Sequence, residues 1–361
     1  MISKRRKTIL VLGGTLGLLF ALAAIFAFEL GFDNNPDWGR GRFALLGSGL
    51  LLLTWAAMEP VRPRIRAVLL TLHDRMGRRL EELAMRRWWR DRADRMDPHQ
   101  RARLLAWTFA AATVFALFAY NWIFTAGRID DWQSGSRYFH RQAEAFAAGQ
   151  LHLLEQPGPE LLAAENPYFY LDRGEIPVLW DALFYDGKYY LYWGPVPGLI
   201  VASLQPLTAE RIRDSFLVGA FMAGYLGFAA ALLLALRRRF EWFPARILPG
   251  ALLALALPGP LLWLFTRPNV YEAAIAGGQF FLMGGLFFAF TAFTREPVSG
   301  RRLALAGLLW GLAANTRVNL VLAIACAGLL VSLRIWFVAS ARSQPFRQTA
   351  TLGLAFGLPL L

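Results

Sequence analysis

Two adjacent carboxylates stand shortly after a long apolar run of the sequence. Asp130 and Asp131 follow the uncharged residues 104–126, so we expect them at the lip of a bilayer, where lipid meets water. A carboxylate there can act as a general base and take the proton of a hydroxyl group. Two neighbouring carboxylates can also raise one another's pKa or share a divalent cation. The pair is therefore the candidate catalytic group, with either aspartate as the base, and the candidate ligand set for a metal.

Three isolated cations are candidates for binding an anion. Arg267 and Arg317 stand between apolar stretches, and Lys188 lies in an aromatic segment before them. A cation at the membrane boundary is costly unless it pairs, and arginine suits a phosphate group. Tyr271 and Glu272 follow Arg267 closely and join it in the predicted substrate-binding set. For Arg267, snorkelling toward lipid headgroups is an equal alternative.

The composition defines the medium in which these groups work. The chain of 361 residues is 56% hydrophobic and only 17% charged, too apolar to cover a soluble surface. Its net charge of +13 is expected in short cytoplasmic loops, rather than in a groove for nucleic acid. One cysteine excludes a disulfide framework, and four scattered histidines do not favour a histidine metal site. We predict an all-α integral membrane protein whose partner is lipid.

Apolar runs of about 20 residues, the length that a bilayer requires, predict the membrane helices. The runs cover residues 9–28, 43–58, 104–126, 215–236, 247–266 and 273–294. The run 303–336 is too long for one helix, and Asn315, Thr316 and Arg317 interrupt it, so we expect two helices there. The prediction is a polytopic helix bundle.

The charges between these runs predict domains and orientation. Residues 1–60 form a two-helix anchor whose basic start is expected in the cytoplasm. The protein is therefore predicted to be a multi-pass protein of the bacterial inner membrane. Residues 61–103 form a basic amphipathic helix that grips anionic lipid or docks a partner. Residues 104–361 form the main membrane domain, with residues 127–193 outside. The apolar run 350–361 stops without a polar flank, which predicts that more chain follows.

The outer loop 127–193 is too long for a mere connection, and long ordered loops usually bind or react. Strong helix formers followed by a glycine predict a helix over residues 138–148. We expect this helix to lie on the outer membrane surface, with the side of Phe139, Ala143 and Phe146 facing lipid.

The second half of this loop is dense in aromatic residues. Asp186 and Gly187 form the turn pair of a tight hairpin. Tyr168 begins the aromatic stretch and is a candidate for contacting substrate. The aromatic rings either form an interfacial belt or offer flat faces on which a sugar ring stacks.

Together these parts suit a lipid that carries a phosphate-linked sugar. The phosphate would lie at the interface near the cations, the sugar outside, and the isoprenoid tail in a groove between helices. Sugar transfer requires a base for the acceptor hydroxyl and cations for the phosphate leaving group.

The sequence resembles the C-type glycosyltransferases that use polyprenyl-phosphate sugars, in an uncharacterised bacterial branch. The resemblance rests on Asp130, Asp131, Tyr138, Ala143, Ala145, Phe146, Gly149 and Leu151, and on the strings at 186–195 and 267–272. It implies inverting sugar transfer on the outer membrane face, with an acidic residue of the first loop as base and no required cofactor beyond a possible divalent cation. The sequence departs from the family because Asp130 lies eight residues before Tyr138, and because two further membrane helices and the arginine-rich segment come before the helix that Asp130 follows.

Two other functions fit the same residues. A transporter or flippase of lipid-linked saccharides also uses broken helices and arginines within the membrane. In a non-enzymatic membrane scaffold, the aspartate pair would only cap the surface helix and the aromatic loop would be a belt.

Overall fold

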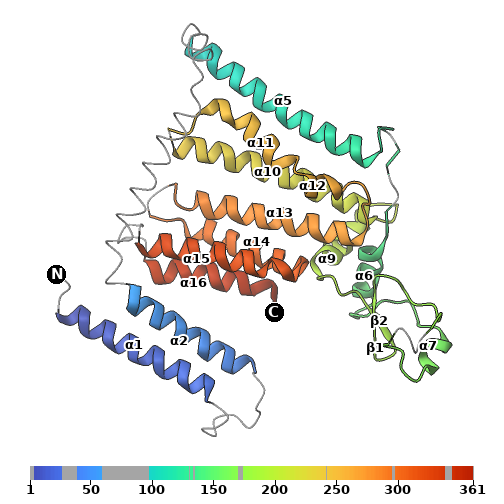
Figure 1. Cartoon of the computed structure of the whole chain (residues 1–361), viewed down its shortest axis with the longest axis horizontal. Coiled ribbons are helices and arrows are strands. Elements are labelled where there is room, and N and C mark those ends of the chain that lie inside the picture. The colour runs from blue at the N-terminus through green and yellow to red at the C-terminus, as the bar shows by residue number, and fades with distance from the viewer. Residues whose placement is uncertain are drawn as a thin grey trace. The chain divides into compact units, whose positions relative to one another are not determined.

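The computed structural model in Figure 1 describes residues 4–26, 39–58, 97–129, 131–132, 135–169, 174–240, 242–294, 297–337 and 344–360. These fall into two compact units. The first is Met1–Met76 with Trp336–Val338, and the second is Gly77–Ile335 with Ala339–Leu361. Asp130 and almost all of the predicted basic helix 61–103 lie outside the described residues.

Nearly all of the described secondary structure is helical. The helices are α1 (Lys4–Ile25), α2 (Arg40–Met58), α5 (Pro98–Phe124), α6 (Tyr138–Ala147), α7 (Pro159–Ala163), α9 (Val196–Leu204), α10 (Asp214–Arg239), α11 (Leu248–Ala256), α12 (Gly259–Trp263), α13 (Val270–Thr291), α14 (Gly300–Thr316), α15 (Val321–Phe337) and α16 (Pro345–Gly357). The strands are β1 (Leu183–Tyr185) and β2 (Lys188–Tyr190).

In the first unit, α1 and α2 pack closely through small residues. A Cβ atom added to Gly17 would lie 2.8 Å from the carbonyl oxygen of Gly49. The buried Arg42 of α2 donates hydrogen bonds to the Ala24 and Ile25 carbonyls, which end α1. An arginine there satisfies carbonyls that a helix C-terminus leaves without an intrahelical partner.

In the second unit, α5, α11, α10, α13, α14 and α16 follow one another side by side (Figure 1). Among the described residues, four helical stretches are long and apolar enough to cross a bilayer. They are Pro98–Phe124, Asp214–Arg239, Val270–Thr291 and Val318–Phe337. Large apolar side chains of α5 are exposed, with Trp107 at 74%. These helices define a membrane-embedded, all-α protein.

Two predicted membrane segments contain breaks. The expectation of one continuous helix over 247–266 is wrong, because α11 stops at Ala256 and α12 begins at Gly259. Pro258 between them lacks the N–H that a continuing helix needs. The expected break of the run 303–336 is confirmed, since α14 ends at Thr316 and α15 begins at Val321.

The loop helix forms where the sequence predicts it, but its apolar face is turned toward protein. In α6, Phe139 and Ala143 are buried, and the helix packs against the short helix α9. The expectation that this side faces lipid is therefore wrong. Periodicity shows that one face of a helix is buried and does not identify what covers it.

The aromatic hairpin matches its prediction. Strands β1 and β2 pair antiparallel, and the turn residues Asp186 and Gly187 have φ values of 47° and 70°. Two successive positive φ angles are those of a type I′ turn, which Asp-Gly favours. Figure 1 shows the hairpin, α6, α7 and α9 gathered at one end of the helices of the second unit, which we name the loop end.

Candidate functional site

An arginine at the loop end lies against two aromatic rings. The Arg317 guanidinium carbon is 4.4 Å from the ring centre of Tyr271 and 5.2 Å from that of Trp193. The two rings meet edge to face, with their centres 5.2 Å apart. Such contacts attract a cation to the ring faces. We name Trp193, Tyr271 and Arg317 the Arg317 cluster.

The cluster contains two buried donors that have no acceptor among the described residues. They are Nη1 of Arg317 and Nε1 of Trp193. A buried donor without a partner costs about 1–3 kcal/mol. The two nitrogens therefore mark a place where an acceptor, and for the arginine an anion, gains binding energy.

Close backbone packing brings Trp193 to this place. A Cβ atom at Gly194 would lie 1.5 Å from the Asn315 carbonyl oxygen, so the backbone at Gly194 lies directly against the last turn of α14. Only glycine tolerates such an approach. Arg317 follows the last residue of α14 in extended backbone, which lets its side chain leave the helix beside Trp193.

Tyr271 is held by the start of α13. Asn269 and Glu272 form a capping box, in which the Glu272 carboxylate accepts the Asn269 amide at 3.2 Å. Glu272 is buried. Glu272, predicted to bind substrate, therefore makes a helix-capping contact in the structure. It stands one position after Tyr271.

A second buried carboxylate ties the loop helix to the membrane helices. Asp214, fully buried at the start of α10, accepts the amides of Tyr138 and Phe139 at 2.9 and 3.1 Å. It also accepts the Ser136 hydroxyl. The Ser136 amide in turn donates to the side chain of Asn269 at 2.9 Å. The sequence analysis missed Asp214, although an acid just before a long apolar run was a signal for a capping contact.

Two tyrosines hold a further aspartate beside the cluster. The Tyr138 hydroxyl donates to the Trp180 carbonyl, and the Tyr192 hydroxyl donates to Oδ1 of Asp181 at 3.5 Å. Burial raises the pKa of Tyr138 and of Tyr192, so both hydroxyls keep their protons and act as donors. The pKa of Tyr192 is further raised by Asp181 and lowered by Arg317. Asp181 and Arg317 thus act on the same hydroxyl group.

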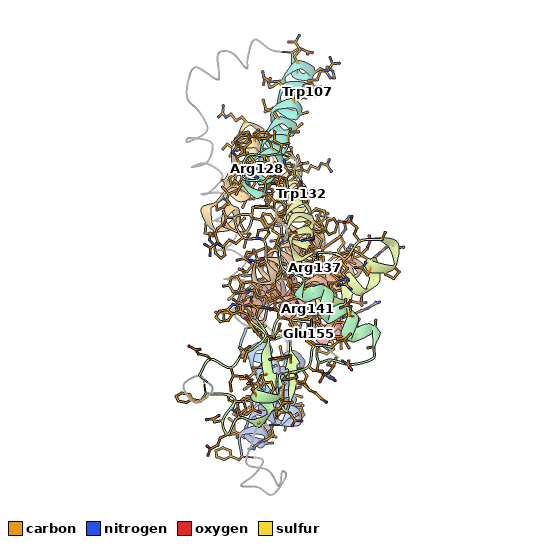
Figure 2. The ribbon with its side chains drawn as sticks, turned by 90° about the vertical axis from the view of Figure 1, so that its right-hand side faces the viewer. Trp107, Arg128, Trp132, Arg137, Arg141 and Glu155 are labelled. Carbon is orange, nitrogen blue, oxygen red and sulfur yellow. The ribbon has the colours of Figure 1, made fainter. Side chains whose placement is uncertain are left out.

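The predicted catalytic residue Asp131 lies in other surroundings. Its carboxylate pairs with Arg128 at 3.0 Å, and the two side chains are 64% and 75% exposed. The neighbouring Trp132 packs on Phe124 of α5. In Figure 2, Arg128 and Trp132 lie apart from the labelled Arg141 and Glu155 of the α6 region. No contact among the described residues joins Asp131 to Arg267 or Arg317.

The remaining predicted binding residues are Arg267, Lys188 and Tyr168. The Arg267 side chain is exposed at the turn between α12 and α13, within electrostatic reach of Glu272. Lys188 is opposite Tyr185 in the register of the two strands, next to the hairpin turn. The ring centre of Tyr168 lies 5.9 Å from that of Phe184. In the described part of the chain, neither Lys188 nor Tyr168 contacts the Arg317 cluster.

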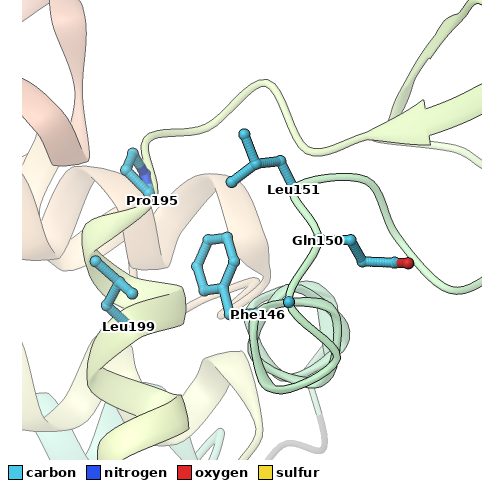
Figure 3. Close-up of a pocket in the computed structure, with 6 residues that line it drawn as sticks. Phe146, Gln150, Leu151, Pro195 and Leu199 are labelled. Atoms are coloured by element: carbon cyan, nitrogen blue, oxygen red, sulfur yellow. The ribbon is translucent and has the colours of Figure 1, made fainter.

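The loop end also contains an apolar groove of about 290 Å³. It lies between the end of α6 and the start of α9, as Figure 3 shows. Phe146, Leu151, Pro195 and Leu199 provide its apolar wall. Pro195 follows Trp193 by two residues, so the groove and the cluster are neighbours along the chain.

The described residues do not offer a ready set of metal ligands. No group of three or more histidine, cysteine, aspartate or glutamate side chains among them is arranged to hold an ion. Asp130 stands outside that search.

Comparison with known proteins gives no match. None of the family models, curated proteins or solved structures compared with the chain matches it.

Proposed function

We propose that this protein is a membrane glycosyltransferase that moves a sugar from a polyprenyl-phosphate donor to an acceptor. The reaction would take place at the loop end, on the outer face of the cytoplasmic membrane. The protein would then be a glycosyltransferase-like bundle of the inner membrane with a cytoplasmic N-terminus.

The observation that carries this proposal is the pair of buried, unpartnered donors in the Arg317 cluster. Arg317 has a charged N–H group and Trp193 a neutral one, and both are buried without an acceptor among the described residues. Charge-assisted bonds from arginine to phosphate are among the stronger hydrogen bonds in proteins. Aromatic faces beside the arginine suit the apolar face of a sugar.

The groove between α6 and α9 suits the lipid part of such a donor. Leu151 and Leu199 are 74% and 50% exposed on its rim, and its wall is almost entirely apolar. Covering these side chains with an isoprenoid chain would remove apolar surface from water at about 25 cal/mol per Å². With the phosphate at Trp193, the isoprenoid chain would run along Pro195 and Leu199, in the same direction as the polypeptide.

The arginines at the other ends of the helices support the orientation. Arg237, Arg238 and Arg239 end α10, whereas Asp214 begins it at the loop end. Arg301 and Arg302 begin α14, whereas Arg317 follows its end. Positive residues collect on the cytoplasmic side of membrane proteins, which favours the loop end as the external one.

In the proposed reaction, the protein orients the donor and stabilises the departing phosphate. The bond between the sugar and the phosphate oxygen breaks, and the phosphate keeps the electron pair while Arg317 offsets its charge. An acceptor hydroxyl forms the new bond to the sugar and loses its proton to a base.

The test is transfer of labelled sugar by the purified full chain in vesicles of bacterial phospholipids. Polyprenyl-phosphate mannose and polyprenyl-phosphate arabinose serve as probes, with bacterial envelope lipid extract as acceptor. We expect wild-type transfer, and a loss of about 100-fold in Arg317→Gln from the lost stabilisation of the leaving group. Arg128→Gln, which removes an exposed arginine of the outer loop 127–193, is the matched control.

Three results would overturn the proposal. In the first, wild type leaves both donors intact; in the second, Arg317→Gln equals wild type; in the third, the intact donor crosses the bilayer with its sugar still attached. The last result would make the protein a transporter of lipid-linked saccharides.

A further inference from the structure

We infer that Asp181 is the general base of the proposed sugar transfer, in place of the aspartates that follow α5. The inference rests on the proposed function and adds the residue that receives the proton. It starts from which carboxylates the fold brings to the loop end and which of them are already engaged.

The other carboxylates near the cluster have partners. Glu272 closes the capping box of α13. Glu155 pairs with Arg141 at 2.9 Å through Oε1, although its buried Oε2 has no hydrogen-bond partner among the described residues. Glu144 lies 3.3 Å from His140. Asp214 accepts two amides and a hydroxyl. Each of these carboxylates is engaged through at least one oxygen, whether in a cap, beside a charged or ionisable side chain or with backbone amides, so protonating that oxygen would weaken a structural contact.

Asp181 differs because, in the described part of the chain, its carboxylate makes a single hydrogen bond and no ion pair. The bond is the long one from the Tyr192 hydroxyl, 3.5 Å. The side chain is half-buried. Its second carboxylate oxygen is therefore free to accept a proton from a bound hydroxyl group.

A hydrogen bond to the preceding residue holds the backbone next to Asp181. Trp180 receives the hydrogen bond of Tyr138, whose own amide is held by Asp214. Asp181 has a φ of 58°, in the left-handed region that aspartate tolerates better than most residues. A base must lie within hydrogen-bond reach of the proton that it takes, and this anchoring gives Asp181 a defined position.

The tyrosine that contacts Asp181 also connects it to the arginine. The rings of Tyr192 and Trp193 lie 4.3 Å apart, and Trp193 contacts Arg317. The Tyr192 hydroxyl responds to the charges of both Asp181 and Arg317. Tyr192 and Trp193 thus connect the acid to the cation by a chain of contacts, and the inferred site takes the acceptor on the Asp181 side and the phosphate on the Arg317 side.

The proton balance of the step is simple. The acceptor oxygen attacks the anomeric carbon, and its proton passes to the free carboxylate oxygen of Asp181. The sugar–phosphate bond breaks on the opposite side, and the phosphate leaves with the bonding electrons toward Arg317. Tyr192 keeps its proton throughout and positions the carboxylate.

The experiment compares Asp181→Asn with two other aspartates of the loop in the same vesicle assay. Asp186→Asn is the matched control, because it removes the same charge at an exposed type I′ turn where asparagine is well accepted. Asp131→Asn tests the rival position. We expect Asp181→Asn to lose about 100-fold or more in transfer rate, with donor binding within about threefold of wild type and Asp186→Asn unchanged.

The outcomes separate this inference from the proposed function. Wild-type transfer with an active Asp181→Asn, or with loss confined to Asp131→Asn, overturns the inference and leaves the proposed function in place. Absence of transfer by wild type overturns both. If Asp181→Asn also loses donor binding, Asp181→Glu decides: recovery of binding with partial transfer supports the base, whereas recovery of neither makes Asp181 structural and overturns the inference.

Discussion

Asp131 and Asp181 belong to the same loop, and each stands next to a tryptophan, yet their surroundings differ. Asp131 lies at the end of α5 and pairs with the exposed Arg128. Asp181 is half-buried, its carboxylate accepts the Tyr192 hydroxyl, and Tyr138 donates to the carbonyl of the preceding Trp180. Proximity to a membrane helix in sequence therefore does not bring a carboxylate into a site. Asp181 is instead tied by side-chain hydrogen bonds to residues of distant segments.

The same contrast holds for the two arginines predicted to bind phosphate. Arg267 is exposed at a turn, whereas Arg317 lies against two aromatic rings with one nitrogen buried. A solvated guanidinium has little to gain from one more partner. A partly dehydrated guanidinium without an acceptor gains more, because the dehydration has already taken place.

The largest effect is expected where the anchoring itself is removed. Asp214→Ala leaves two buried amides and the Ser136 hydroxyl without their acceptor, so we expect a loss of about 3 kcal/mol in the free energy of unfolding. Asp131→Ala, which removes an exposed pair, should cost less than about 0.5 kcal/mol. Unfolding in detergent micelles measures both. Equal losses in the two variants would remove the distinction between anchored and exposed carboxylates.

The next effect concerns the approach of the loop to α14. Gly194→Ala places a Cβ atom against the Asn315 carbonyl oxygen, and the backbone has to move, at a cost of about 2 kcal/mol. Gly158→Ala is the control, since nothing lies within 4 Å of its Cβ position and its φ is −61°. Thermal unfolding and donor binding should both fall in Gly194→Ala alone. An unchanged Gly194→Ala would show that the two segments are not in contact.

A smaller change tests the shape of the cation. Arg317→Lys keeps the charge but loses the planar group that lies against Tyr271 and Trp193. Donor affinity, measured with labelled polyprenyl-phosphate mannose, should fall about tenfold. Arg128→Lys should stay within about twofold of wild type. Full affinity in Arg317→Lys would mean that charge alone, and not the aromatic contact, sets binding.

The smallest effect is expected at the α5 end. A double-mutant cycle on Arg128 and Asp131 should give a coupling of about 0.5 kcal/mol or less, because both side chains are mostly exposed. The coupling is measured from the unfolding free energies of the two single variants and the double variant. A coupling above about 2 kcal/mol would place this pair in a less solvated environment than that of the Arg317 cluster.

Much of the framework could be predicted from residue patterns. The apolar runs predicted α5, α10 and α13, the interruption near Arg317 predicted the break before α15, and Asp-Gly predicted the hairpin turn. These features depend on the length of an apolar run, on local periodicity and on turn chemistry, and residues close together in the sequence determine all three. The break at Pro258 was missed because the mean hydropathy of a long apolar run changes little when one of its residues is a proline.

The site was less predictable. Asp181 has no motif around it, and its position depends on tyrosines 43 residues before it and 11 residues after it. Asp214 caps a helix that precedes it by about 70 residues, a contact that local sequence does not encode.

The sequence by itself determined that this chain belongs in a membrane, where its long helices run, and which residue types are available for acid, base and anion chemistry. The tertiary structure alone decided that Arg317 and not Arg267 lies among aromatic rings, that α6 faces α9 and not lipid, and that Asp181 accepts the hydroxyl of Tyr192. The reason is physical. Hydrophobicity and backbone preference act over a few residues, whereas burial of a charge depends on which distant segments close around it.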